Sequence, residues 1–349
     1  MSLLTPAPAS LCILRLSAIG DVTHVLPTLN CIQKQWPDCK ITWIIGKLEH
    51  QLVYDIPNVE FIIYDKSKGS KANQLLEDEL NGRQFDILLH MQISLRASLA
   101  SRHIRAKQRI GFDFKRARNF QWLFTNKKIA YVPQQHVLDS FLEFPKRLGI
   151  NTDTIEWNIP VADSDNAFVQ NAIPSKNYIV INASASNNIR NWSAEHYAAV
   201  IDYLHEKYNL HTVLSGGPVN YEIELSQSIH DLSNNKPTVL TGKTSLKQLA
   251  ALLKNASLVI APDTGPAHIA NALGTPVIGL YANSNPYRTG PYSNIENTVN
   301  QYPDALLETY GKKVSQVRWG RRVRRDDIMD FIKKEDVIKK IDLVLKSTN

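Results

Sequence analysis

The stretch APDTGPAH at residues 261–268 follows the apolar run 258–260 and leads into IANAL at 269–273. This pattern predicts a buried strand, a tight turn and a helix, with Pro266 where a helix needs no N–H donor. Free amides and the helix dipole favour a phosphate in such a turn, and Asp263, Thr264 and His268 add polar side chains. A nucleotide diphosphate suits this site. The alternative is that Asp263 or Thr264 only caps an ordinary helix.

A second turn of this kind lies far upstream. Residues 11–16 are a short apolar run, and SAIGDVTH at 17–24 leads into a helical stretch from 25 to about 35. One such turn in each half suggests two facing domains, because ligands bind at the carboxyl ends of the strands in such sheets. Asp21 could then act as a general base, with helix capping as the alternative. His24 is expected on the helix surface or as a minor substrate contact.

Length and composition agree with two soluble domains. The chain has 349 residues, of which 43% are hydrophobic and 21% are charged. No apolar run approaches the roughly 18–20 residues that span a bilayer, and residues 1–10 lack the features of a secretion signal. We therefore expect a cytoplasmic protein. The three cysteines lack metal-site spacing, and neither a disulfide nor zinc is expected.

Strands alternate with helices along the chain, which predicts an α/β fold with parallel sheets and helices on both faces. The polar stretch 151–165 is the best linker candidate, and it contains the chain's single Asp-x-Asp spacing, Asp163 and Asp165, which we interpret as helix capping. The expected domains are 1–160 and 166–325, with a helical segment at about 326–349 packing back on the first. The predicted strands are 11–16, 41–45, 59–64, 85–90 and 129–132, then 178–182, 211–215, 238–240, 258–261 and 276–281.

Two further loops of the second half follow predicted strands. Arg190 lies in NASASNNIRNW at 182–192 and could pair with a diphosphate, because a guanidinium makes two charge-assisted bonds to phosphate oxygens. The alternative is a solvated loop arginine. Trp192 is expected to bury its ring beside the next helix. The turn SGGP at 215–218 lets a ligand approach the backbone, although this signal alone is weak.

Four motifs, at 17–21, 190–192, 215–217 and 263–268, occur in the order seen in the lipopolysaccharide heptosyltransferases, family nine of the glycosyltransferases, and the chain resembles that family over nearly its whole length. The resemblance implies the GT-B architecture, in which two Rossmann-like domains with parallel sheets face each other across a cleft. It also implies an inverting mechanism and ADP-heptose as the donor. Asp21 matches the family's catalytic base, and Arg190 matches a basic residue near the donor phosphates.

The resemblance assigns Asp263, Thr264, Gly265 and His268 to the donor-binding turn, and the other expected binding residues come from the strand-end loops and the first basic cluster. No cofactor and no metal are expected, since amides and a guanidinium can balance the diphosphate. The expected donor-binding residues are Ser184, Ser186, Gly216, Asp263, Thr264, Gly265, Pro266, His268 and Tyr281. The expected acceptor-binding residues are His24, Lys66, Gln92, Arg96, Lys115, Arg116 and Arg118.

The sequence departs from the family's pattern in two places. Arg190 stands where the family commonly has lysine, and YANSNP at 281–286 stands where a Tyr-Gly turn is common. These differences leave the donor's base and sugar open. A related transferase that uses a hexose donor or a heptose acceptor is therefore the alternative.

The net charge of +7 is concentrated in two basic clusters, at residues 96–128 and 312–325. Such clusters attract polyanions. No nucleic-acid-binding signature accompanies them, whereas lipid A that carries acidic Kdo sugars is a polyanion at an anionic membrane face. Aromatic residues interleave with the first cluster, so contact with lipid is also expected. We therefore expect a Kdo-lipid A acceptor and a peripheral location at the inner face of the inner membrane, with a solvated basic surface as the alternative.

Two other function classes fit less well. A dinucleotide-dependent oxidoreductase needs a Gly-x-Gly-x-x-Gly turn, which SAIGD at 17–21 lacks. A polyanion-binding protein without catalytic activity would keep the basic clusters but would have no use for Asp21.

Overall fold

The computed structural model describes residues 3–348 and divides into two compact units, Met1–Pro160 and Val161–Asn349. Each unit contains a six-stranded, wholly parallel sheet. Residues 1, 2 and 349, which belong to the expected ranges 1–160 and 326–349, lie outside the described part. The α/β class with two parallel sheets is confirmed.

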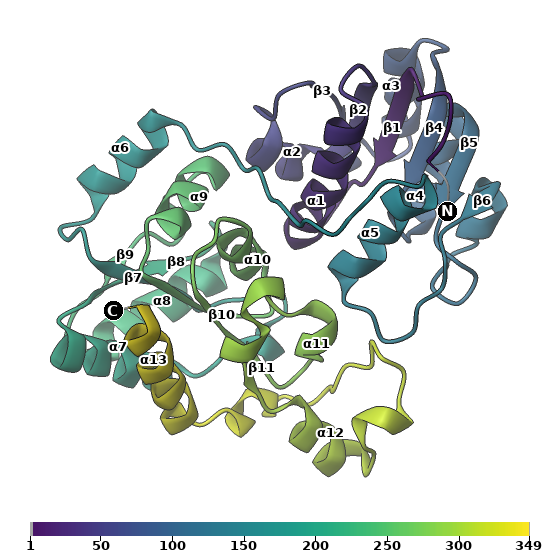
Figure 1. Ribbon diagram of the computed structural model, residues 1–349. Coiled ribbons are helices and arrows are strands. Elements are labelled where there is room, and N and C mark those ends of the chain that lie inside the picture. Colours follow the sequence, from purple (N-terminus) through teal and green to yellow (C-terminus); the bar gives the residue numbers. More distant parts are fainter. Residues whose placement is uncertain (1–2, 349) are drawn as a thin grey trace. The chain divides into compact units, whose positions relative to one another are not determined.

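The first unit has the strand order β3-β2-β1-β4-β5-β6, which is the order of a dinucleotide-binding Rossmann sheet (Figure 1). Its strands are β1 (Ser10–Leu14), β2 (Lys40–Gly46), β3 (Val59–Tyr64), β4 (Gln84–His90), β5 (Arg105–Gly111) and β6 (Lys127–Lys128). Its α-helices are α1 (Ile19–Gln35), α2 (Lys47–Val53), α3 (Lys71–Leu80), α4 (Leu95–Ala100) and α5 (Val137–Arg147).

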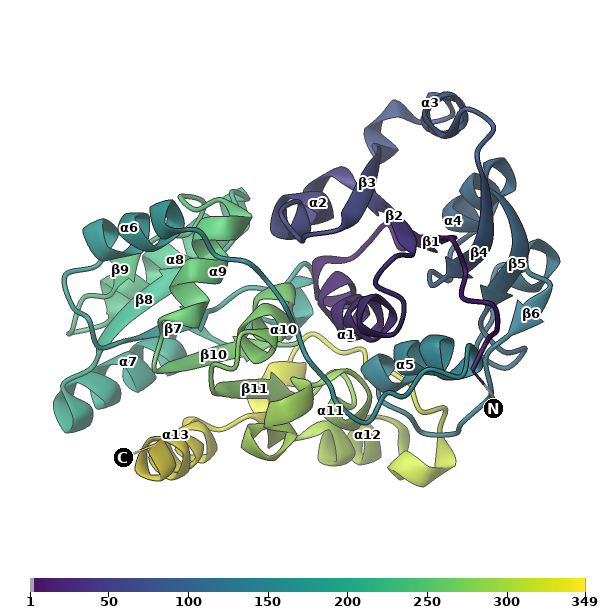
Figure 2. The same cartoon turned by 45° about the horizontal axis from the view of Figure 1, so that its top comes forward.

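Both faces of this sheet are covered, which explains why its central strands are continuous apolar runs rather than alternating ones. Side chains of α3 and α4, such as Leu76 and Ala97, pack with Leu14 and Leu88 of the sheet in one core cluster. Helices α1 and α5 pack against each other, and Figure 2 shows them on the opposite side of the sheet from α3. Cys12, Cys31 and Cys39 are buried free thiols in this unit.

The second unit repeats the same topology with the order β12-β11-β10-β7-β8-β9 (Figure 1). Its strands are β7 (Tyr178–Asn182), β8 (His211–Ser215), β9 (Thr238–Val239), β10 (Leu258–Pro262), β11 (Val277–Tyr281) and β12 (Val299–Asn300). Its α-helices are α6 (Asp163–Ala172), α7 (Ala194–Tyr208), α8 (Asn220–Leu232), α9 (Leu246–Lys254), α10 (Gly265–Ala272), α11 (Pro286–Thr289), α12 (Tyr302–Tyr310) and α13 (Lys334–Thr348).

The C-terminal helix α13 belongs to the second unit, whereas the sequence analysis expected it to pack back on the first. Asp342 of α13 accepts hydrogen bonds from Tyr203 Oη at 2.6 Å, Tyr208 Oη at 2.7 Å and Lys207 Nζ at 2.9 Å, all on α7. Val337 and Ile341 are fully buried in the second unit's core, as is the predicted core residue Trp192. The segment therefore completes the unit from which it emerges.

Strand β5 was not predicted from the sequence. The strand predicted at 129–132 is wrong, because the strand that pairs with β5 is the two-residue β6, which ends just before residue 129. Arg105, Lys107 and Arg109 occupy alternate positions of β5, so the strand lacks the apolar residues that would show a two-residue period. Long basic side chains can line a strand because their stems pack while their charges reach water. Strand β12 was also missed.

Residues 151–162 contain no helix or strand, in agreement with the predicted linker, but 163–165 form the first turn of α6. Asp163 and Asp165 therefore lie at a helix start, where their charges favour the helix dipole. Among the described residues, no helix has the length and apolar content that crossing a membrane requires.

Candidate active site

The turn after β1 presents Asp21 in the first turn of α1, and Arg15 holds its carboxylate. Arg15 Nη2 lies 2.5 Å from Asp21 Oδ2, and the Ala18 N–H donates to the same oxygen at 3.3 Å. The Asp21 side chain is 37% exposed, so a substrate can reach it. The carboxylate thus contributes to the helix start, as the capping alternative expects, while remaining accessible for chemistry.

Arg15 is itself fixed by the core of the first unit. Its Nη1 donates to the Met91 carbonyl at 2.7 Å, and its guanidinium lies 5.1 Å from the ring centre of Phe141. The Trp43 indole N–H donates to the Arg15 carbonyl at 3.1 Å. The Arg15 side chain is only 10% exposed, so it orients Asp21 from the buried side of the turn. Sequence reasoning missed it because an arginine inside an apolar strand gives no sign of which way it points.

Gln92, predicted to bind the acceptor, braces the same turn. Its Oε1 accepts from the Leu16 N–H at 2.6 Å and the Ser17 N–H at 3.2 Å, and its Nε2 donates to Ser17 Oγ at 3.1 Å. Gln92 follows β4, the neighbour of β1 in the sheet. The turn that carries Asp21 is therefore fixed from two sides, by Arg15 and by Gln92.

A pocket of about 690 Å³ opens beside this turn at the carboxyl ends of the strands. Leu16, Ser17 and Gln92 line it on one side, and Lys66 and Arg96, both predicted acceptor contacts, line it on another. A smaller pocket of about 340 Å³ shares Lys66 and Arg96. The structure thus brings three of the predicted acceptor residues together around one pocket, together with Lys47, which was not predicted.

Glu49, on α2, gives this pocket a buried carboxylate that sequence reasoning did not find. It is only 5% exposed, and burial raises the pKa of its carboxyl above the usual range. A Cβ at Gly46 would collide with this carboxylate and with the Leu16 carbonyl. The close approach of β2 to the turn after β1 therefore needs glycine at this position. The pocket therefore offers both cations and a hydrogen-bonding acid.

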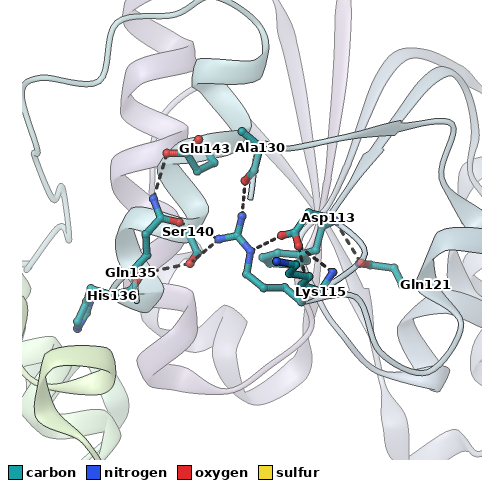
Figure 3. A network of polar contacts seen from close by, with 10 residues as sticks. Asp113, Lys115, Gln121, Ala130, Gln135, His136, Ser140 and Glu143 are labelled. Atoms are coloured by element: carbon teal, nitrogen blue, oxygen red, sulfur yellow. Dashed lines mark hydrogen bonds and ion pairs between the residues drawn. The ribbon is translucent and has the colours of Figure 1, made fainter. Parts of the chain in front are cut away.

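The other predicted acceptor residues lie elsewhere. His24 is buried, 3% exposed, and its ring lies edge-on to His136 with 5.5 Å between centroids, so the expectation of a helix-surface position is wrong. Arg116 is partly buried, and its guanidinium donates to Asp113, Gln135, Ser140 and the Ala130 carbonyl, all labelled in Figure 3. It is therefore committed to holding its own loop. Lys115 and Arg118 are exposed.

In the second unit, the turn between β10 and α10 has the predicted form. Thr264 is the N-cap of α10, and Gly265 and Pro266 begin the helix. The Thr264 hydroxyl makes no capping bond and instead donates to Asn182 Oδ1 at 3.2 Å, at the end of β7. The amides at the helix start are thus left available, which favours the anion-site interpretation over simple capping.

Asp263 is a buried residue at the centre of the polar contacts around this turn. Arg190 Nη1 donates to the Asp263 carbonyl at 2.6 Å and lies 3.7 Å from its Oδ2, while Ser284 Oγ donates to Oδ2 at 2.8 Å. His268 Nε2 lies 3.8 Å from Oδ1. Burial pushes the pKa of Asp263 upward, but His268, Arg190 and Ser284 outweigh it and the pKa is lowered overall. Asp263 is therefore ionised and locks Arg190 beside the turn.

Glu222, on α8, is a further carboxylate that the sequence analysis missed. It accepts from Ser184 Oγ at 2.5 Å and from the Gly217 N–H at 2.8 Å. A Cβ at Gly216 would lie 2.9 Å from Glu222 Oε2, which explains the glycine at this position. Tyr221 donates to the Ala185 carbonyl at 2.8 Å. The predicted residues Ser184 and Gly216 thus surround Glu222 at the ends of β7 and β8.

Comparison with known proteins agrees with this geometry. The model of glycosyltransferase family 9 (heptosyltransferase) matches residues 75–312. The lipopolysaccharide core heptosyltransferase OpsX of Haemophilus influenzae is 42% identical over 339 residues, which is 97% of each chain. The chain belongs to glycosyltransferase family 9. It is therefore a glycosyltransferase.

Solved structures confirm the GT-B class of the fold. A family 9 glycosyltransferase from Veillonella parvula matches with a TM-score of 0.82 at 22% identity, covering 99% of this chain and 100% of its own. The E. coli heptosyltransferase WaaC with ADP matches with a TM-score of 0.73 at 21% identity, covering 96% and 99%.

One feature of this family 9 chain corrects an expectation for the donor side. Tyr281, predicted to contact the donor, is 1% exposed and donates to the Thr289 carbonyl at 3.1 Å, so it is a core residue. Ser186 is exposed and accepts from Arg190 Nη2 at 3.4 Å. Side chains of the segment 281–286 make internal hydrogen bonds. Asn283 exchanges two hydrogen bonds with the Val323 backbone, and Ser284 Oγ donates to Asp263 Oδ2.

Proposed function

We propose that this family 9 enzyme transfers heptose from ADP-heptose to Kdo of the lipid A inner core, with inversion at the anomeric carbon and without a metal. The observation that carries the proposal is Asp21: an accessible carboxylate, gripped by Arg15, beside a pocket at the carboxyl end of a Rossmann sheet. The name of OpsX, a lipopolysaccharide core heptosyltransferase, and the ADP of the WaaC structure support the acceptor and donor classes.

The donor diphosphate belongs at the start of α10. The amides of that helix start and its dipole face an anion there, and Arg190 supplies the positive charge. Arg190 Nη1 is committed to the Asp263 carbonyl, whereas Nη2 makes only a long bond to Ser186 at 3.4 Å. Nη2 is therefore the donor that turns to a phosphate oxygen. Glu222 offers the carboxylate that a ribose hydroxyl would need.

The acceptor belongs in the pocket of the first unit. Lys47, Lys66 and Arg96 line it, and such cations suit the carboxylate of Kdo. Glu49 can receive a hydrogen bond from a sugar hydroxyl in the same pocket. A heptose acceptor would bring no carboxylate of its own to these three cations.

In the proposed reaction Asp21 removes the proton from the acceptor hydroxyl as its oxygen attacks the anomeric carbon of the donor. The bond to the diphosphate breaks as the new glycosidic bond forms, so one displacement inverts the configuration. Positive charge develops on the sugar ring, while Arg190 and the α10 start stabilise the departing ADP.

We propose that the reaction takes place in the cytoplasm at the inner face of the inner membrane, because the acceptor is a lipid. A guanidinium and helix amides supply the stabilisation that a metal gives in other transferases, which is the support for metal independence.

A panel of ADP-heptose, ADP-glucose, GDP-mannose and UDP-glucose, each with Kdo-lipid A or heptosylated Kdo-lipid A, tests the proposal. We expect turnover only with ADP-heptose and Kdo-lipid A, an inverted anomer by NMR, and unchanged rates in EDTA. Turnover with a hexose donor or with the heptosylated acceptor would favour the alternative transferase. Retention of configuration would exclude the single displacement.

A further inference from the structure

We propose that residues 112–132 of the first unit form a docking surface for an anionic lipid bilayer, hereafter the docking loop. The inference rests on the proposed function in one respect, because a lipid-borne acceptor gives the surface its purpose. Its physical evidence is independent of the reaction.

The docking loop exposes an unusual number of large apolar side chains. Phe114 is 67% exposed, Phe120 63% and Leu123 61%, and Trp122, Tyr131 and Val132 range from 38% to 44%. Phe120 has φ of 58°, a left-handed conformation that is costly for a bulky side chain. Apolar surface gathered in this way indicates an interaction site.

Cations surround these apolar groups. Lys128 Nζ lies 3.2 Å from the ring centre of Phe114, and Lys115 Nζ lies 4.3 Å from that of Tyr131. Arg118 and Lys127 are exposed. Within the described chain, none of these four cations pairs with a carboxylate, because Asp113, the single acid of the loop, is bound to Arg116. Exposed apolar groups among unpaired cations fit the interface of an anionic membrane.

The loop is held from within, so its apolar groups are presented rather than left to collapse. The Arg116 guanidinium donates to Asp113, Ser140 and the Ala130 carbonyl, three residues labelled in Figure 3, and so ties the two ends of the loop together. Arg109 binds the Phe124 carbonyl at 2.8 Å and the Ser101 carbonyl at 2.6 Å. Two arginines that look like part of a basic patch in the sequence therefore build the loop.

A buried glutamine joins the docking loop to the catalytic turn. Gln121 is 0% exposed, and its Nε2 donates to the His90 carbonyl at 2.9 Å and the Gln92 carbonyl at 3.2 Å. Gln92 in turn braces Leu16 and Ser17 in the Asp21 turn. A bilayer bound to the loop is thereby near the acceptor pocket, so a lipid-borne sugar need not leave its membrane.

Nucleic acid is the other polyanion that such charges could attract, but the aliphatic groups Leu123 and Val132 argue against it. Single-stranded nucleic acids are held by aromatic platforms on which bases stack, whereas aliphatic side chains gain most from acyl chains.

Co-sedimentation with phosphatidylcholine vesicles, with and without 30% phosphatidylglycerol, tests the proposal. We expect binding to anionic vesicles that weakens in salt and drops at least tenfold in the triple variant Phe120→Ser, Trp122→Ser, Leu123→Ser. Reversing Lys115 and Arg118 to glutamate should cost more than fivefold per charge, since each cation near the surface contributes about fivefold in affinity. Leu75→Ser and Lys40→Glu, exposed changes away from the loop, should bind as wild type.

Fluorescence gives a readout that is independent of vesicle capture. Brominated lipids should quench the wild-type signal but not that of Trp122→Phe. The fold of each variant is checked by its thermal stabilisation with ADP. Transfer by the triple variant to a water-soluble Kdo acceptor, which needs no membrane, should stay near wild type. Equal binding to neutral vesicles, unchanged binding of the triple variant, or binding of a single-stranded oligonucleotide in place of vesicles would overturn the docking loop. Loss of transfer to the soluble acceptor in wild type would instead count against the proposed function.

Discussion

Both contacts that fix the Asp21 carboxylate use the same oxygen. Arg15 and the Ala18 N–H bind Oδ2, so Oδ1 is the oxygen that would meet an acceptor hydroxyl in the proposed reaction. In that reaction Arg15 is a positioning residue, because it acts through Asp21. The same logic applies in the second unit, where Asp263 positions Arg190.

Replacing Arg15 with methionine should lower kcat about 100-fold, which is the order of loss for a reacting group displaced by an ångström. The KM for the donor should change little, because Arg15 does not contact it in the proposed complex. Steady-state kinetics checks this, with Arg15→Lys expected to recover part of the rate. Arg83→Met, which removes an exposed ion pair with Glu60, is the matched control. An equal rise in KM and fall in kcat would point to general damage instead.

Replacing Arg190 with alanine should weaken ADP binding about 10- to 100-fold, since charge-assisted bonds contribute roughly 1.5–3 kcal/mol. Isothermal titration with ADP measures this directly. Arg190→Lys should bind better than Arg190→Ala because it keeps the charge. Wild-type affinity in Arg190→Ala would show that the diphosphate is held elsewhere.

Glu49 gives a pH-dependent prediction. Its folded-state pKa is raised above the ordinary value of 4.5, so the folded state binds the proton more tightly than the unfolded state. The stability that this provides is present at low pH and is lost as pH rises from about 4.5 through the raised pKa. Chemical denaturation from pH 4 to 8 should show wild type losing stability relative to Glu49→Gln over that range. A constant difference would contradict a buried, perturbed acid.

Among elements, the strands with buried apolar runs were predictable and those made of polar residues were not. The ranges expected at 178–182 and 211–215 match β7 and β8, because strands buried along almost their whole length carry a clear apolar signal. The range 59–64 also matches β3, a partly exposed edge strand rich in β-branched and aromatic residues. Strand β5 was hidden by its cations. The turns after β1 and β10 were predictable because a turn, a helix start and a small residue follow each other in sequence.

The hydrogen-bond partners of the site residues could not be predicted from the sequence. Ser184 and Glu222 are 38 residues apart, and Arg190 and Asp263 are 73 apart. Their contacts depend on which strands are neighbours, and only the order of the sheet decides that. For the same reason the sequence does not distinguish Arg116 from a surface cation, because its partner Ser140 lies 24 residues away.

Helix α13 gives a prediction at the element scale. Its Asp342 takes three hydrogen bonds from α7; although burial acts against ionisation, those bonds lower the pKa of Asp342 to about 2. A lowered folded-state pKa contributes stability above the unfolded value of 3.8 that is lost as pH falls toward 2. Asp342→Asn should cost about 1–2 kcal/mol at neutral pH, and this cost should shrink on acidification.

Thermal denaturation at pH 7 and pH 3 measures that change. Glu335→Gln is the matched control, since Glu335 is an exposed carboxylate on the same helix. An Asp342→Asn variant as stable as wild type would mean that α13 is held by its apolar face alone.

On the scale of the whole molecule, two units of the same topology carry different chemistry. The first unit holds Asp21, the pocket and the proposed docking loop, and the second holds the proposed anion site at Arg190, Asp263 and α10. The two domains could be predicted from the two turns, whereas the GT-B class followed from the resemblance that the four motifs carry to family nine of the glycosyltransferases. The proposed division of labour, with acceptor on one unit and donor on the other, is what activity measurements must decide.

The most direct test is the rate of heptose transfer by Asp21→Asn, measured with ADP-heptose and Kdo-lipid A alongside ADP affinity. Loss of a general base predicts a fall in kcat of about 10²- to 10⁴-fold. ADP affinity should remain within twofold of wild type, because the anion site lies on the other unit. Asp38→Asn, an exposed aspartate of the same unit, should be fully active. An Asp21→Asn enzyme that turns over within a few-fold of wild type would contradict the account.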